Sequence, residues 1–60
     1  MENSKPFHEV ANGDINVWVD EGGAICIKSR EPFGDPVELA EHEALELANL
    51  LIRLVEELRN

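Results

Sequence analysis

The stretch from Ala40 to Asn60, AEHEALELANLLIRLVEELRN, decides the fold of this chain. It contains neither proline nor glycine, and its apolar residues recur every three or four positions, which is typical of an amphipathic helix. Acidic residues crowd its start and arginines its end, in the sense that the helix dipole favours. The sequence therefore predicts one long C-terminal helix over about residues 41–59.

The apolar arc of this helix is wide. At about 100° per residue it covers about 220°, whereas one packing contact needs a stripe of about 100° or more. Its members are Ala44, Leu45, Leu47, Ala48, Leu50, Leu51, Ile52, Leu54, Val55 and Leu58. Glu43 and Arg59 lie near the two edges of the arc. One small sheet can therefore cover only part of it.

Two upstream segments alternate between faces, as half-buried strands do. They are DINVWVD at 14–20 and AICIKSR at 24–30, joined by Glu21-Gly22-Gly23. We predict an antiparallel β-hairpin here, in which the glycines supply the positive φ of a tight connection.

The register of this hairpin follows from the faces. A two-residue turn would mix them, whereas a three-residue loop with Gly23 in the left-handed conformation opposes Val19 with Ile25. The remaining predicted pairs are Val17 with Ile27, Trp18 with Cys26, Asn16 with Lys28, and Asp14 with Arg30.

The rest of the chain is less patterned. Residues 1–12 show no periodicity and predict a loosely ordered tail on a single small domain, 1–60, with a turn at Asn12-Gly13. Residues 31–36 predict a loop. The segment between this loop and the helix has two possible interpretations: a capping box that starts the helix at Pro36, or a short third strand at 37–39 with the helix starting near Glu41. Local chemistry favours the first, because Ala40 is a poor N-cap.

Composition limits the function classes. Sixty residues make a marginally stable domain, and the single cysteine, Cys26, rules out an internal disulfide and argues against a cysteine-based metal site. Oligomerisation is then the expected support. Thirteen acidic against five basic residues, a net charge of −8, argue against nucleic acid or an anionic membrane as partner. No signal peptide or long apolar run is evident, so a cytoplasmic setting is expected.

Candidate chemistry is sparse. We interpret Cys26 as a packing residue beside Trp18, and His42 as a solvated residue on the polar helix face. A metal site from Glu41, His42 and Glu43, completed by His8 across a dimer, is the alternative, although adjacent helical residues do not converge on one point. There is no HExxH motif, phosphate loop or serine beside a base, so we expect neither catalysis nor a cofactor.

The order IxVWVDEGGAIxIK, then GDPVEL, then EHEALELANLLxxL resembles short uncharacterised bacterial proteins built as a β-hairpin, a brief third strand and one C-terminal helix. The resemblance covers about residues 14–58. It implies the extended interpretation of 37–39, which we adopt, and it implies no activity. The predicted fold class is therefore α+β.

The wide helical arc predicts a partner. The hairpin could cover about half of it, and monomers of this size seldom leave such a patch exposed. We expect a homodimer or higher oligomer, with the interface at Leu47, Leu50, Leu54, Leu58 and Trp18. The alternative is a monomer in which Phe7 and Phe33 cover the leftover surface.

The predicted role is that of a non-catalytic interaction or structural protein. One alternative is an acidic, antitoxin-like inhibitor that masks a basic surface on a partner. A second is a metal- or ligand-binding module at a dimer seam.

Overall fold

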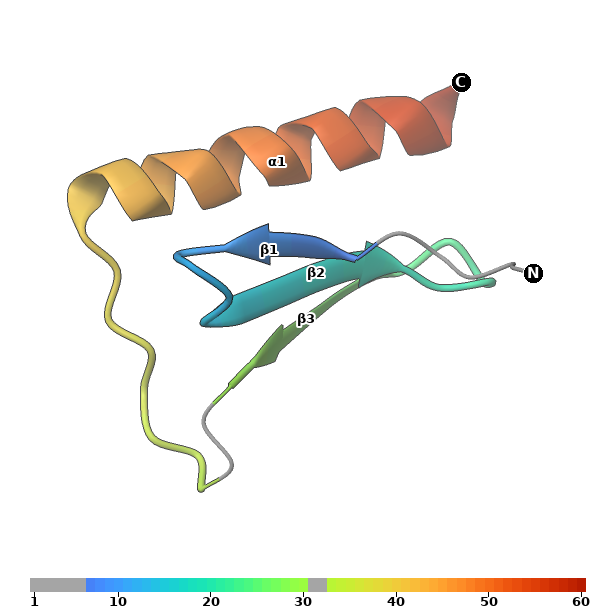
Figure 1. Cartoon of the computed structure of the whole chain (residues 1–60). Coiled ribbons are helices and arrows are strands. Elements are labelled where there is room, and N and C mark those ends of the chain that lie inside the picture. The colour runs from blue at the N-terminus through green and yellow to red at the C-terminus, as the bar shows by residue number, and fades with distance from the viewer. Residues whose placement is uncertain (1–6, 31–32) are drawn as a thin grey trace.

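A computed structural model describes residues 7–30 and 33–60. Its elements are β1 (His8–Val10), β2 (Ile15–Val19), β3 (Ile25–Ser29) and α1 (Glu41–Arg59). The strands form one antiparallel sheet in the order β1-β2-β3, and α1 lies along β1, with β3 farthest from the helix (Figure 1). This is a small α+β fold, as predicted.

The β2–β3 hairpin has the predicted register. Val19 opposes Ile25, Trp18 opposes Cys26, and the ladder continues in step to Ile15 opposite Ser29. Just beyond it, the backbone N–H of Arg30 donates to the carbonyl oxygen of Asp14 at 2.9 Å. The loop closes around Asp20, whose Oδ1 accepts hydrogen bonds from the backbone N–H groups of Gly22 at 2.9 Å and Ala24 at 3.0 Å. Gly23 takes a φ of 89°, the left-handed conformation that the three-residue loop requires.

The third strand is not at residues 37–39, where the sequence predicts it. Residues 33–40 contain no strand; Val37 and Leu39 point inward and pack against the core, but in the described chain they join no ladder. The third strand is instead β1, inside the segment predicted to be a loose tail, of which residues 1–6 lie outside the described residues. Three residues are too few to show a strand period, which explains the error.

The turn between β1 and β2 supports this strand. Ala11, Asn12 and Gly13 have φ values of 57°, 58° and 92°, and the N–H of Gly13 donates to the carbonyl oxygen of Val10 at 3.2 Å. The Asn12-Gly13 turn is therefore confirmed, and it folds β1 back onto β2.

The hydrophobic core lies between α1 and the first two strands. Its buried residues are Val10, Ala11, Ile15, Val17, Leu50 and Leu54. Because α1 covers the β1 side of the sheet, Ile27 on β3 stays 52% exposed although it opposes fully buried Val17. The sheet is thus only partly covered.

The helix begins at Glu41, in agreement with the extended interpretation of the preceding residues. Ala40 is extended, with φ −67° and ψ 164°, and has no side-chain oxygen to cap the helix. The side chain of Glu43 compensates in part, because its Oε1 accepts the N–H of Ala40 at 2.9 Å. Half of a capping box is therefore present, and it accounts for an acidic residue at the edge of the apolar arc.

Completing the capping box should stabilise the chain. Ala40→Ser places a hydroxyl where it can accept a backbone N–H of the first turn, and the expected gain is about 1 kcal/mol in the free energy of unfolding. Urea denaturation followed by circular dichroism measures it. The control is Ala24→Ser, an exposed site outside the helix. An equal effect of both substitutions would contradict the capping argument.

Candidate functional site

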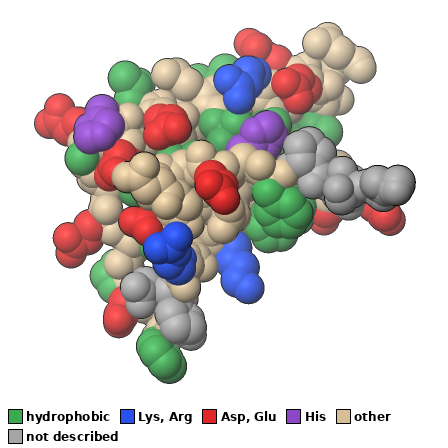
Figure 2. All heavy atoms as spheres, in the orientation of Figure 1, with side chains coloured by type: hydrophobic (Ala, Val, Ile, Leu, Met, Phe, Trp, Pro, Cys, Tyr) green, Lys and Arg blue, Asp and Glu red, His purple; other side chains and the backbone are tan. Residues whose placement is uncertain are grey.

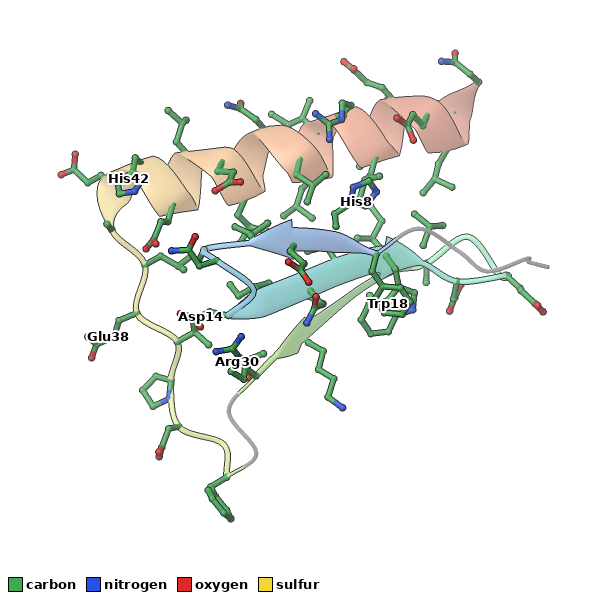
Figure 3. The ribbon with its side chains drawn as sticks, in the orientation of Figure 1. His8, Asp14, Trp18, Arg30, Glu38 and His42 are labelled. Atoms are coloured by element: carbon green, nitrogen blue, oxygen red, sulfur yellow. The ribbon has the colours of Figure 1, made fainter. Side chains whose placement is uncertain are left out.

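The polar residues gathered at one end of the sheet form an ordinary surface ion pair. Arg30 Nη1 lies 3.8 Å from Asp14 Oδ1, and both side chains are more than half exposed. Together with Glu38 they border an open hollow beside residues 33–40, the linker between β3 and α1 (Figure 3). An exposed pair of this kind contributes little to stability, and the one cation that lines the hollow, Arg30, is already paired with Asp14. No substrate chemistry follows from it.

Cys26 lies in an acceptor-rich setting. Its Sγ is 3.8 Å from Asp20 Oδ2 and 4.0 Å from the carbonyl oxygen of Ala24. Both contacts suit a thiol that donates weak hydrogen bonds, whereas a reactive thiolate needs nearby positive charge. These contacts agree with the interpretation of Cys26 as a packing residue.

The two histidines lie apart. His42 is in the first turn of α1, whereas His8 is in β1, beneath a later part of the helix (Figure 3). Within residues 7–30 and 33–60, no three His, Cys, Asp or Glu side chains are grouped so that they could hold a metal ion. The alternative of a metal at a dimer seam therefore gains no support from a single copy.

The acidic side chains are dispersed on the face of the molecule that Figure 2 shows. On the face shown in Figure 2 they are scattered, with basic and histidine side chains between them, and many lie at the rim. A surface that imitates a polyanion or seals a basic site would concentrate negative charge. On this face the negative charge is spread out instead.

An exposed apolar surface lies on α1. Leu45 is 62% exposed and Ile52 58%, and Ala48 and Val55, on the same side of the helix, are exposed as well. We call these four residues the outer helix face. Next to it is a shallow depression lined by Leu51, Ile52, Val55, Glu56 and Arg59.

The predicted interface residues have other environments. Leu50 and Leu54 are buried in the core, and Leu47 packs partly against it, so the chain's own sheet occupies the side of α1 that was assigned to a partner. Leu58 is the exception, being 44% exposed. This corrects the residues of the predicted interface, while self-association itself stays a prediction.

Trp18 also has a partner within the chain. Its ring lies against that of Phe7, with the centroids 4.8 Å apart and the planes tilted by 31°. Phe7 thus covers part of Trp18, as the monomer alternative required, whereas Phe33 is 87% exposed and covers nothing comparable.

Sequence reasoning missed the outer helix face. All four of its residues were in the wide apolar arc, but the pattern did not show which edge the sheet would cover. The position of Glu43 within the arc was one signal. In the structure its side chain caps the start of the helix and is half-buried, and it marks the sheet-facing side of α1, which also carries Leu50 and Leu54.

Comparisons with protein-family models, curated proteins and solved structures gave no match. The resemblance to short bacterial proteins therefore stays a prediction. In the described part of the chain, α1 is too polar to cross a membrane, and no other helix is present.

Proposed function

We propose that this chain is a small, non-catalytic protein that works by self-association, in a cytoplasmic setting. The observation that carries the proposal is the outer helix face, where Leu45, Ala48, Ile52 and Val55 are exposed side by side. Apolar surface of this kind on so small a domain favours an interface.

The small core gives a second argument. In the described part of the chain the core consists of six buried hydrophobic residues, and Cys26 is a free thiol, so the chain has few internal means to raise its stability. Burying the outer helix face against a second copy would stabilise the folded state by mass action. The high negative charge then keeps the assembled protein soluble.

The size of the particle tests the proposal. Light scattering across a concentration series should show the mass rising from the 6.7 kDa of one chain to twice that value. The thermal midpoint should rise over the same concentrations, because folding and association are coupled. A mass of 6.7 kDa and a constant midpoint up to millimolar concentration would overturn self-association.

A further inference from the structure

Six exposed residues of α1 form a regular seam. Their spacing alternates between four and three residues, as it does along the contact between two packed helices. The six residues are Glu41, Leu45, Ala48, Ile52, Val55 and Arg59. All six are exposed. The seam thus consists of the outer helix face with an acidic residue, Glu41, at one end and a basic residue, Arg59, at the other.

This seam points away from the sheet. At 3.6 residues per turn, its centre lies about 140° around α1 from buried Leu54. The far side of the helix from β1 is open (Figure 1). A second helix can therefore approach the seam without displacing the sheet.

We propose that α1 of a second copy docks antiparallel on this seam, around a two-fold axis level with Leu50. This inference rests on the proposed self-association and specifies its partner surface. This axis pairs each residue of one copy with the residue equally far from position 50 on the other side in the second copy. Glu41 therefore meets Arg59, Leu45 meets Val55, and Ala48 meets Ile52. Each pair occurs twice, as an isologous interface requires.

Charge decides the direction. In the antiparallel arrangement Glu41 of each copy lies near Arg59 of the other, which gives two pairs of opposite charge. In a parallel arrangement Glu41 would meet Glu41 and Arg59 would meet Arg59. Like charges in direct opposition disfavour the parallel arrangement.

Shape agrees with the same register. A side chain on one packed helix enters a hole formed by four residues of the facing helix, at positions i, i+3, i+4 and i+7. Ile52, Val55, Glu56 and Arg59 have this spacing, and all four line the depression on α1. The residue that the register places over this depression is Leu45 of the second copy, which is 62% exposed in the single chain. At the centre, small Ala48 faces Ile52 and allows the helices to approach closely.

The two flanks of the seam are self-complementary as well. On one flank the two-fold brings Leu51 next to Leu51 and Leu58 near Ala44 of the second copy. On the other it brings His42 near Glu56. The docked helix would thus cover part of Leu58, the one residue of the sequence-predicted interface that the sheet leaves exposed.

Disulfide trapping tests the register. In a Cys26→Ser background, which removes the natural thiol, we compare Leu45→Cys alone, Val55→Cys alone, and an equal mixture of the two. Antiparallel docking places position 45 of one copy against position 55 of the other, whereas two positions 45 are about 15 Å apart along the helices. Under mild oxidation the mixture should therefore yield a disulfide-linked heterodimer, identified by mass spectrometry, and each variant alone should yield at least tenfold less.

The outcomes separate the inference from the proposed function. If Leu45→Cys alone cross-links as efficiently as the mixture, the helices are parallel or unspecific and the register is wrong. If nothing cross-links while light scattering shows a dimer, the copies meet at another surface and only the inference fails. If every variant and the unmodified chain are monomeric, both fail. Circular dichroism of each variant establishes that α1 remains folded.

Discussion

Replacing Leu54 with alanine should remove most of the stability of this chain. Leu54 is 2% exposed and packs in the six-residue core between α1 and the sheet. Truncating a buried leucine costs about 2–5 kcal/mol, and sixty residues are stabilised by about 3–9 kcal/mol in total. Urea denaturation followed by far-ultraviolet circular dichroism should show a loss of this size in the free energy of unfolding.

Leu45→Ala is the matched control for this change. It makes the same truncation in the same helix, but at a residue that is 62% exposed. Under dilute conditions that keep the chain monomeric, we expect a loss below about 1 kcal/mol, because alanine favours the helix and little buried surface is lost. Equal losses at the two positions would show that α1 does not pack on the sheet through Leu54.

The contrast between these leucines shows what the sequence could and could not predict. The period of α1 and its C-terminal position follow directly from the spacing of its apolar residues. Which edge of the apolar arc packs on the sheet does not follow from the spacing, because both edges carry leucines, Leu45 on one side and Leu54 on the other. That choice depends on how the linker places the helix over β1, a long-range feature without a local signal.

The sheet, too, was predictable in one part and not in another. The β2–β3 register was predictable, since a one-residue slip would have turned Val17 and Ile27 to opposite faces. β1 was not, because its three residues HEV alternate too briefly and contain a histidine on the inner face. Residues 37–39 misled for the converse reason: Val37 and Leu39 do alternate inward, but they pack there without strand pairing.

The candidate surface was predictable only in kind. An arc too wide for one small sheet predicts leftover apolar area, and the structure shows such area on α1. The identity of the exposed residues required the packed structure, because burying Leu50 and Leu54 leaves Leu45, Ile52 and Val55 outside. Once those residues are known, the sequence itself gives the two oppositely charged ends of the seam, Glu41 and Arg59.

Ile52→Glu should dissociate the dimer and leave each chain folded. Ile52 is 58% exposed in the single chain, so glutamate there meets water and suits a helix. In the proposed dimer the same residue lies at the central layer, against Ala48 of the second copy. Two unpaired carboxylates would then be buried in place of two isoleucines, and the dissociation constant should rise by about a hundredfold or more. Sedimentation velocity measures this change.

The control for Ile52→Glu must match its charge without touching the seam. Arg53→Gln also makes the chain more negative by one unit, but it lies about 100° further around α1. If general repulsion between acidic chains governs association, both variants should weaken the dimer equally, and added salt should restore both. If the seam governs it, Arg53→Gln should remain dimeric, and salt should not rescue Ile52→Glu, because the defect is a desolvated carboxylate at a packed contact. Retained helical circular dichroism in the dissociated variant would separate this surface from the core around Leu54, where the same substitution should unfold the chain.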